Sequence, residues 1–392
     1  MMVDSMDTEG AESARAGAGP TDVSIVIPSL DEAETIGVCI EKIKAVFLRY
    51  GIKGEVIVAD NSDDDTPKIA RSLGAKVVTP DKMGYGYAYL YGLRYANGKY
   101  IVLGDADDTY DFTEMPRLLK PLMNDEADIV IGSRFKGEMK RGAMPWLHRY
   151  VGNPVLTFLV NLFFDAEVSD AHSGFRAFRR DVLEKVALKS TGMEFASEMI
   201  LKAVRAGLRI NEVPITYYPR RGRSKLSGFR DGWRHLRFML LFTPKYLYFV
   251  PGALSTAFGL LMLLIALLNI HLGYSPGIHS SLLGGMLTIL GYNVFILGFF
   301  SDIYLNKSIG VEMSKVTSTL LKKFTLERSV LLGLLLFVIG AAYVLYLFLA
   351  WTNSGFKVLP LRGENILAFT LVVIGLQTVF YSFMLTVLTE RI

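Results

Sequence analysis

The chain has a single cysteine and few charged residues. With Cys39 alone, neither a disulfide framework nor a zinc ribbon can form. Charged residues make up 20% of the 392 residues, below the roughly 25% of soluble domains, whereas 51% are hydrophobic. The net charge of +4 gives no indication of nucleic-acid binding, and we expect no nucleic-acid partner. The 24 phenylalanines and 19 tyrosines supply enough apolar area to exclude disorder over most of the chain.

Residues 1–20 lack both a periodic pattern and a continuous apolar run. Their small residues and scattered charges predict a disordered tail. Because no apolar core is present, we do not expect a signal peptide. The first ordered segment should therefore begin near Val23.

Four apolar runs without Asp, Glu, Lys or Arg occupy the second half of the chain. They cover Leu247–Ile270, Ser280–Ser301, Ser329–Trp351 and Ile366–Leu388. Each is close to the roughly 20 residues that cross a bilayer, which predicts four transmembrane helices in two hairpins. Basic residues precede the first run and fill the connection between the second and third, so we expect the N-terminal domain on the cytoplasmic side. The absence of ionisable residues argues against an ion pathway.

Apolar β-branched runs alternate with helical patterns in the first half. The predicted strands are Val23–Pro28, Glu55–Asp60, Lys76–Thr79, Tyr100–Gly104 and Asp128–Gly132. The predicted helices are Glu34–Arg49, Thr66–Leu73, Tyr85–Ala96 and Glu114–Met123. This alternation predicts an α/β domain with a doubly wound, mostly parallel sheet. Ligands of such sheets bind at the carboxyl ends of the strands.

Two further stretches, Pro145–Phe164 and Phe229–Phe242, combine aromatic and basic residues at helical spacing. Helices of this kind lie in the headgroup layer of a membrane, although the same pattern also fits ordinary core packing. We divide the chain into a tail (1–20), an α/β domain (21–225), a juxtamembrane interfacial helix (226–246) and a transmembrane domain (247–392).

Four carboxylates crowd the end of the fourth predicted strand, in the segment GDADDTYD (Gly104–Asp111). Asp105 and Asp107, separated by one small residue, can direct both carboxylates at one divalent cation, which relieves their mutual repulsion. The alternative is an acidic loop in which Asp108 or Asp111 caps the next helix.

Other polar residues also follow predicted strands. Asp60 ends the second strand, where a carboxylate can accept a hydrogen bond from a base or a ribose. Arg134 ends the fifth strand, and Arg176 lies in DAHSGFRAF. A compact basic group, Arg220–Lys225, suits a polyanion such as a diphosphate, although part of it also fits a basic flank of the first membrane span.

Six segments in this order resemble the family 2 glycosyltransferases, and more narrowly the polyprenol-phosphate hexosyltransferases, the dolichol-phosphate mannose and glucose synthases. They are VSIVIPSLDEAETI, VIVADNSDDDT, GKYIVLGDADDTYD, VIGSRF, SGFRAF and RRGRSKL. The resemblance covers Asp22 to about Phe242 closely and the membrane half in layout only. It implies a GT-A fold, a nucleotide-sugar donor, a Mg²⁺ or Mn²⁺ ion and a lipid-phosphate acceptor.

The resemblance also implies roles for individual residues. The residues implied to bind the nucleotide sugar are Pro28, Asp31, Glu32, Asp60, Asp105, Asp107, Arg220 and Lys225, with Ser224 beside Lys225. Asp105 and Asp107 match the metal-binding pair. For the acceptor phosphate they are Arg134, Ser173 and Arg176, to which we add Arg149. We expect Asp105, Asp107, Arg134 and Arg176 to be catalytic. Some relatives have Gln where this chain has Thr109, so Thr109, Asp111 and water stay open as the third metal ligand.

The implied reaction is transfer of a hexose from GDP-mannose or UDP-glucose to dolichyl or polyprenyl phosphate, with inversion. A glycosyltransferase acting on a hydroxyl acceptor is an alternative that would need a general base, for which Asp108 and Asp170 are candidates. A lipid-sugar flippase is a third. The QxxRW segment of processive synthases is absent, because Gln377 is the only glutamine. We expect an integral protein of a prokaryotic cell membrane with a cytoplasmic catalytic domain, and a homo-oligomer is left open.

Overall fold

A computed structural model of the chain describes residues 21–221, 228–271, 273, 277–309, 313–357, 359 and 362–389. The predicted tail (1–20) and two predicted site residues, Ser224 and Lys225, lie outside the described residues. The chain divides into two compact units, one ending at Met239 and one beginning at Leu240.

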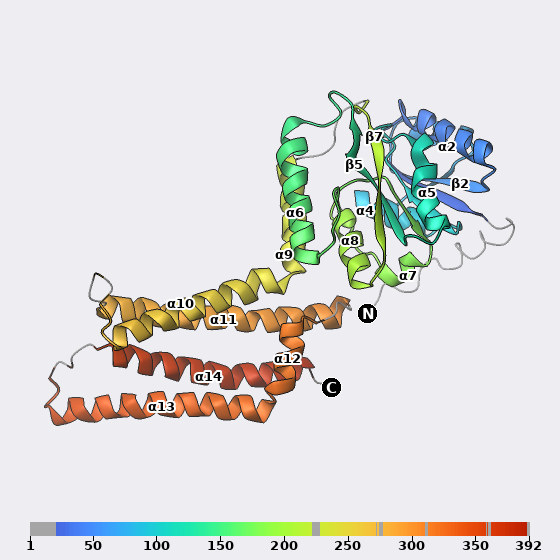
Figure 1. The fold of residues 1–392 in the computed structure, drawn as a ribbon. Helices are drawn as coiled ribbons and strands as arrows, with labels where there is room; N and C mark the ends of the chain where they lie inside the picture. The colour runs from blue at the N-terminus through green and yellow to red at the C-terminus, as the bar shows by residue number, and fades with distance from the viewer. Residues whose placement is uncertain are drawn as a thin grey trace. The chain divides into compact units, whose positions relative to one another are not determined.

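A seven-stranded mixed sheet forms the centre of the N-terminal unit (Figure 1). Its strands are β1 (Val23–Ser29), β2 (Gly54–Asp60), β3 (Lys76–Val78), β4 (Tyr100–Leu103), β5 (Ile129–Met139), β6 (Arg176–Arg179) and β7 (Ile210–Tyr217). They lie in the order β3-β2-β1-β4-β6-β5-β7, and only β6 runs antiparallel to its neighbours. The five predicted strands and the mostly parallel arrangement are confirmed.

The sequence patterns missed β6 and β7 and ended β5 too early. β6 is the short segment RAFR, with an arginine at each end, and β7 contains polar residues and Pro214. Arg134 does not end β5, because the strand continues to Met139, which pairs with Tyr217 of β7. These segments lack a continuous apolar run, so their strand pairing depends on neighbours distant in sequence.

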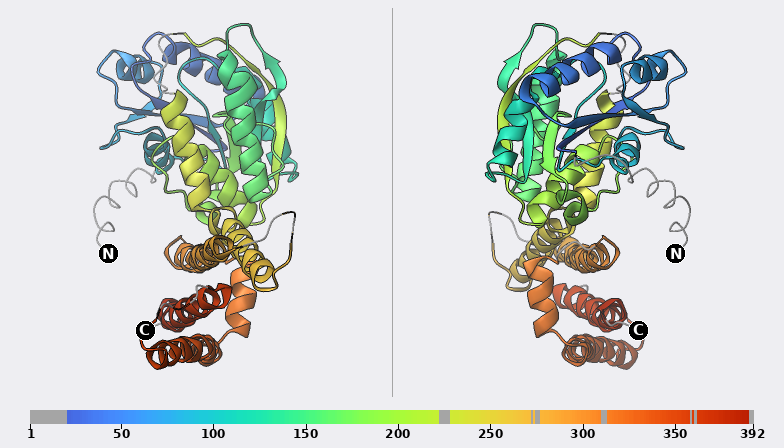
Figure 2. Two further views of the ribbon diagram at one scale, coloured as in Figure 1. Left: turned by 90° about the vertical axis from the view of Figure 1, so that its left-hand side faces the viewer. Right: turned by 90° about the vertical axis from the view of Figure 1, so that its right-hand side faces the viewer.

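Helices cover both faces of the sheet, as the side views in Figure 2 show. On one face, α2 (Ile36–Tyr50), α3 (Thr66–Ser72) and α5 (Met115–Met123) share a core with alternate residues of β1, among them Ile25. On the other face, α4 (Tyr85–Leu93) approaches Val26 closely, and its Tyr89 stacks on Phe195 of α8 (Phe195–Arg205). The short α7 (Val182–Val186) packs on β6 and α8. Such two-sided cover explains why β1, β2 and β4 each contain a continuous apolar run.

Two helices of this unit are amphipathic. α6 (Asn153–Phe164) follows a π-helical turn, His148–Gly152, and together with the residues before it leaves a row of large apolar side chains exposed. The row comprises Trp146, Leu147, Tyr150, Val151, Val155, Phe158 and Leu162. α9 (Gly228–Leu241) buries His235 and Phe238 and leaves Trp233 exposed. Core packing therefore accounts for one side of α9, but not for the exposed row before and along α6.

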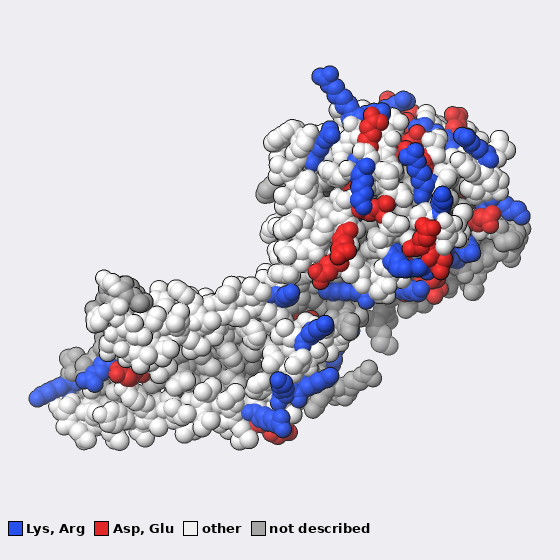
Figure 3. Space-filling model, in the orientation of Figure 1, with Lys and Arg blue, Asp and Glu red and all other residues white. Residues whose placement is uncertain are grey.

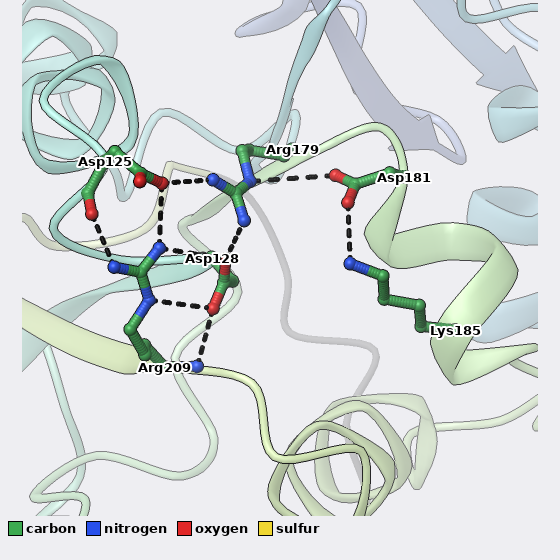
Figure 4. Close-up of polar contacts among 6 residues, drawn as sticks. All are labelled: Asp125, Asp128, Arg179, Asp181, Lys185 and Arg209. Atoms are coloured by element: carbon green, nitrogen blue, oxygen red, sulfur yellow. Dashed lines mark hydrogen bonds and ion pairs between the residues drawn. The ribbon is translucent and has the colours of Figure 1, made fainter.

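Ion pairs close the sheet edge at which β5 and β7 begin (Figure 4). Asp128, just before β5, accepts hydrogen bonds from Arg209 Nε (3.1 Å) and from the Arg209 backbone N–H (2.8 Å). Asp128 also pairs with Arg179 at the end of β6, and Asp125 accepts from both arginines. This network joins the ends of three strands, at the edge opposite the carboxyl ends of β1 and β4.

The C-terminal unit contains four helices long and apolar enough to cross a membrane. The first is Lys245–Leu267, which consists of the π-helical turn Lys245–Phe249 and α10 (Val250–Leu267). The second is Ile278–Lys307, within α11 (Ile278–Ile309). The third and fourth are α13 (Leu326–Asn353) and α14 (Gly363–Thr389). Their mean hydropathy is 1.8 to 2.6. A short helix, α12 (Lys315–Lys323), lies between the second and third. On the face that Figure 3 shows, Lys, Arg, Asp and Glu are scarce along the long helices. Each of the four predicted runs falls on one of these helices, although the first helix ends at Leu267, before the predicted Ile270.

These helices pack as two close pairs, α10 with α11 and α13 with α14. A Cβ at Gly259 of α10 would lie 2.5 Å from the backbone nitrogen of Thr288, so only glycine permits this approach. Small residues are the usual means of packing helices in lipid. Two hydrogen bonds join α11 to α14: the Tyr292 and Thr378 hydroxyls lie 2.7 Å apart, and the Tyr381 hydroxyl donates to Asn293 Oδ1 (2.5 Å). The two hairpins are therefore linked to each other.

Candidate active site

The loops after β1 and β2 are fastened together by short polar contacts. Asp60, the last residue of β2, is buried and accepts from the Ser62 hydroxyl (2.6 Å) and backbone N–H (3.2 Å). Asp31, in the left-handed region at φ 47°, accepts from the Asp63 N–H (3.2 Å), and its own N–H donates to the Ser62 hydroxyl (2.6 Å). Pro28 lies beside these loops in register with Ala59. The structure thus brings Pro28, Asp31 and Asp60 to one edge of the sheet.

A residue that the sequence patterns missed lies at the same edge. Ser29 is paired in register with Asp60, and its hydroxyl is buried with no hydrogen-bond partner among the described residues. Unpaired buried hydroxyls are rare, which makes Ser29 a candidate contact for a ligand bound at this edge.

Asp105 follows β4 and is held by two tyrosines of α4. The Tyr85 hydroxyl donates to Asp105 Oδ1 at 2.8 Å, and the Tyr89 hydroxyl lies 3.3 Å from the same atom. Burial, and then the charge of Asp107, raise the pKa of Asp105 to about 7 despite these hydrogen bonds. Neither tyrosine was predicted as a site residue. Their spacing of four places both on one helix face, but only the fold shows that this face meets Asp105.

Asp107 accepts a hydrogen bond from Thr109 and forms an ion pair with Arg220. The Thr109 hydroxyl donates to Asp107 Oδ1 (2.6 Å), and Arg220 Nη1 lies 3.2 Å from Oδ2. Arg220 also pairs with Glu32, so this arginine, three residues after the end of β7, joins the loop after β1 to the loop after β4. Arg220, Glu32 and Asp107 were all predicted to face the nucleotide sugar, and the structure brings them together.

The other two carboxylates of the acidic segment have structural contacts. Asp108 pairs with Lys42 of α2 at 2.7 Å, and Asp111 lies 3.6 Å from the same ammonium group. Asp111 also accepts from the Thr113 N–H (3.1 Å) and so caps the 3-10 helix Phe112–Glu114. The helix-capping interpretation therefore holds for Asp111.

Asp105 and Asp107 fit a divalent cation. Their hard carboxylate oxygens are the donors that Mg²⁺ and Mn²⁺ prefer, and their like charges together with burial disfavour two ionised groups without a cation nearby. Within the part of the chain that the structure describes, no group of three or more His, Cys, Asp and Glu side chains is arranged to hold a metal. The protein would therefore supply this carboxylate pair, and other oxygens would complete the coordination.

Arg134 forms a buried, two-pronged ion pair with Asp170. Arg134 Nε and Nη2 donate to the two carboxylate oxygens at 2.7 and 2.8 Å, and the Arg134 backbone N–H adds a third bond at 3.0 Å. Asp170 is 0% exposed, and the Arg134 guanidinium lies over the Tyr217 ring, 5.2 Å from its centre. Both candidate general bases, Asp108 and Asp170, are therefore held in ion pairs.

Arg176 holds a loop in place. The residue is 2% exposed, and its guanidinium donates to the carbonyl oxygens of Ser173 (2.8 Å), Ala171 (2.7 Å) and Ala196 (2.8 Å). Three main-chain acceptors favour a positioning role for Arg176 over direct contact with an acceptor phosphate. In contrast, the Ser173 hydroxyl is buried and has no partner among the described residues.

Arg149 takes no part in the contacts described above, and its own contact is with an aromatic ring. It belongs to the π-helical turn before α6, with its guanidinium 5.4 Å from the centre of the Tyr150 ring. Within the described chain, no hydrogen bond or ion pair joins Arg149 to the other predicted site residues.

Gly174 connects the acidic pair to the arginine-bearing segment Asp170–Arg176. A Cβ at this position would lie 2.8 Å from Asp105 Oδ2 and 3.1 Å from the Tyr85 hydroxyl, so the backbone passes directly beside the carboxylate. The Gly174 N–H also donates to the Tyr110 hydroxyl (2.8 Å). The segment that holds Ser173 therefore lies directly beside the acidic pair.

Comparisons with known proteins find similarity to one family over most of the chain. Residues 24–187 match the model of glycosyl transferase family 2, and residues 303–389 match the family's C-terminal transmembrane region. The low-salt glycan biosynthesis hexosyltransferase Agl6 of Haloferax volcanii is 46% identical over 379 residues, which are 96% of this chain and 91% of that protein. A dolichyl-phosphate hexose transferase of the same organism is 34% identical over 214 residues, 54% of this chain and 89% of that protein.

Among solved structures, glucosyl-3-phosphoglycerate synthase from Mycobacterium tuberculosis aligns with a TM-score of 0.46 and 24% identity, over 59% of this chain and 81% of that one. The assignment rests instead on the family models and on the Haloferax relatives, whose lengths this chain covers almost fully. The chain is a membrane protein with a GT-A domain, and it belongs to glycosyltransferase family 2.

Proposed function

We propose that this enzyme transfers a hexose from a nucleotide sugar, GDP-mannose or UDP-glucose, to dolichyl or polyprenyl phosphate, giving a lipid-phosphate-linked sugar for glycan assembly. The observation that carries the proposal is the contact between Asp105 and Gly174, which sets the acidic pair beside the segment Asp170–Arg176. The names of the Haloferax relatives, a glycan hexosyltransferase and a dolichyl-phosphate hexose transferase, support the same reaction class.

On the donor side, Asp105 and Asp107 would hold Mg²⁺ or Mn²⁺, which when bound offsets charge on the leaving nucleoside diphosphate. Pro28, Asp31 and Asp60 would border the nucleotide. Arg220, with Lys225 beyond the described residues, would bind the diphosphate through charge-assisted hydrogen bonds.

On the acceptor side, the ion pairs of Asp108 and Asp170 favour a phosphate nucleophile over a hydroxyl. A hydroxyl acceptor needs a general base, whereas a lipid monophosphate has a second pKa of about 6 and is largely a dianion at neutral pH. The dianion attacks the anomeric carbon, the bond to the nucleoside diphosphate breaks, and direct displacement inverts the anomeric centre. Arg134 Nη1, which Asp170 does not use, and the Ser173 hydroxyl would position the phosphate.

A membrane-bound acceptor also suits the amphipathic helices. The exposed row before and along α6 includes Trp146 and Phe158, residues that favour the boundary between headgroups and lipid tails. The basic connection before α13 favours a cytoplasmic orientation of the catalytic domain, in a prokaryotic cell membrane. A flippase is less well supported, because the four predicted runs contain no charged residue.

The test uses the full chain, purified in detergent, with Mn²⁺ or Mg²⁺, radiolabelled donors and dolichyl phosphate. We expect a hexose–lipid product with one donor and none with dolichol, which lacks the phosphate. Product on dolichol but not on dolichyl phosphate would favour the hydroxyl-acceptor alternative. No product with either lipid and any donor, from folded protein, would refute the proposal.

A further inference from the structure

Two histidines and a serine meet beside the arginine-bearing segment, and the reaction above makes no use of them. Ser197 Oγ of α8 lies 3.1 Å from His235 Nδ1 of α9 and 3.4 Å from His172 Nε2. The two imidazole rings are nearly perpendicular, with centres 4.5 Å apart. His172 immediately precedes Ser173, so the cluster joins the proposed acceptor segment to two helices.

The other nitrogen of His172 has no partner in the part of the chain that the structure describes. Nδ1 is buried and makes no hydrogen bond to any described residue, and the same holds for the hydroxyl of its neighbour Ser173. Buried polar atoms are rarely left unpaired, so two such atoms in adjacent residues indicate that a ligand pairs with them.

The surroundings of His172 favour an anion. Burial, and then the charges of His235, Arg134 and Arg176, lower the pKa of His172 well below its ordinary value, so the imidazole is neutral at neutral pH. A neutral imidazole is a donor at one nitrogen and an acceptor at the other. When the Ser197 hydroxyl donates to Nε2, the hydrogen of His172 lies on Nδ1. An N–H near two arginines is suited to an anionic oxygen.

We infer that His172 Nδ1–H donates a hydrogen bond to the phosphate of the acceptor, and that Ser197 and His235 fix the tautomer that makes this possible. His172 is thereby a substrate-binding residue, and Ser197 and His235 are positioning residues. The inference rests on the proposed function, which supplies the lipid phosphate. A neutral donor adds to acceptor binding without adding charge to a site that already contains Arg134.

Kinetics of single variants test the contact. His172→Ala should raise the KM for dolichyl phosphate about three- to tenfold, the value of one neutral hydrogen bond, with the KM for the nucleotide sugar unchanged. His172→Asn, which is smaller and polar, serves if the alanine variant does not fold. His279→Gln, a histidine of α11 outside the cluster, should behave as wild type. An unchanged acceptor KM in a folded His172 variant would overturn the inference.

Nuclear magnetic resonance of the full chain in detergent, with ¹⁵N-labelled histidine, tests it without turnover. The chain has five histidines, so each ring signal can be assigned by one substitution. We expect the His172 ring to carry its hydrogen on Nδ1 and to shift when a short-chain polyprenyl phosphate is added, but not with the corresponding alcohol. Ser197→Ala should mix the two tautomers and raise the acceptor KM less than His172→Ala does.

The two proposals fail in different ways. Transfer to lipid phosphate with no shift of the His172 ring would leave the proposed function standing and reject the role of His172. A lipid-phosphate-dependent shift without any transfer would support the binding contact and reject the proposed reaction. A ring with its hydrogen on Nε2 in the presence of the lipid phosphate would also reject the inference.

Discussion

Arg220 forms an ion pair with Asp107, with Nη1 and Oδ2 3.2 Å apart, and this contact ties the end of β7 to the acidic segment after β4. The same guanidinium pairs with Glu32, and its Nε is buried without a hydrogen-bond partner among the described residues. Arg220 therefore joins two groups assigned to the nucleotide sugar.

Replacing Arg220 should weaken donor binding. Arg220→Ala removes a charge-assisted contact, so we expect the KM for the nucleotide sugar to rise about 10- to 100-fold and the KM for the lipid phosphate to change little. Arg220→Lys keeps the charge but loses the planar fork and should fall in between. Initial rates with each substrate varied in turn measure this split, and a selective effect on the acceptor would place Arg220 in the wrong half of the site.

Asp107→Asn should abolish transfer while the protein still folds. The change keeps the size of the side chain but removes a charge that would bind the cation, so we expect activity below about 1% of wild type at saturating Mn²⁺. Asp111→Asn is the matched control, because Asp111 caps a 3-10 helix and lies near Lys42. We expect it to keep more than half of the activity. Comparable losses in both variants would mean that Asp111 also serves the cation.

Arg134 should be needed for stability as well as for acceptor binding. Arg134→Ala leaves the Asp170 carboxylate buried and unpaired, which should cost about 3–5 kcal/mol of unfolding free energy. Adding Asp170→Asn should recover part of that loss, whereas Arg134→Lys should fold and raise the KM for lipid phosphate. Thermal midpoints and acceptor titrations of the three variants check this, and an Arg134→Ala protein as stable as wild type would contradict it.

Local sequence patterns predicted the apolar strands and the helices that alternate with them, but not β6, β7 or the contacts between side chains. β1, β2 and β4 are apolar runs that any reading of periodicity finds, and Asp105 and Asp107 stand out at the end of one of them. In contrast, β6 is a four-residue segment whose strand pairing is tertiary. Such patterns show which residues follow a strand, but they do not show which of those side chains are already paired with other groups of the protein.

Arg134 and Arg176 show what the sequence patterns could not predict. The sequence assigned Arg134 and Arg176 the same role, yet one pairs with a carboxylate and the other with three carbonyl groups. Asp170 and Ala196, their partners, carry no local signal of these contacts. His172 and Tyr85 were missed for the same reason, since a histidine in a loop and a tyrosine in a helix are ordinary until the fold brings polar atoms to them.

The ion pairs at the opposite edge of the sheet should govern stability without affecting transfer. Burial opposes ionisation of Asp128, but hydrogen bonds from Arg209 and the charge of Arg179 more than compensate and lower its pKa. A carboxyl with a lowered folded pKa stabilises the protein above its unfolded pKa, near 3.8, and loses this contribution as the pH falls through the folded value. Asp128→Asn should therefore lower the thermal midpoint at pH 7 and leave the KM values unchanged. A midpoint equal to that of wild type at pH 7 would show that the network adds nothing.

Cys39 should report whether site variants are folded. It lies on α2 beneath the acidic segment, fully buried, with Sγ 3.6 Å from the carbonyl oxygen of Ala106. Burial, and then the charge of Asp108, raise the pKa of its thiol to about 12, so almost no thiolate is present at neutral pH. We expect a maleimide reagent to leave the native chain unlabelled and to label it rapidly in denaturant, with a single adduct by mass spectrometry.

Because Cys39 contacts the segment that holds Asp107, an inactive Asp107→Asn protein that stays unlabelled would have lost chemistry rather than structure. Rapid labelling of the native wild-type chain would show that the acidic segment opens, and the loss of activity in its variants could then no longer be attributed to the missing charge alone.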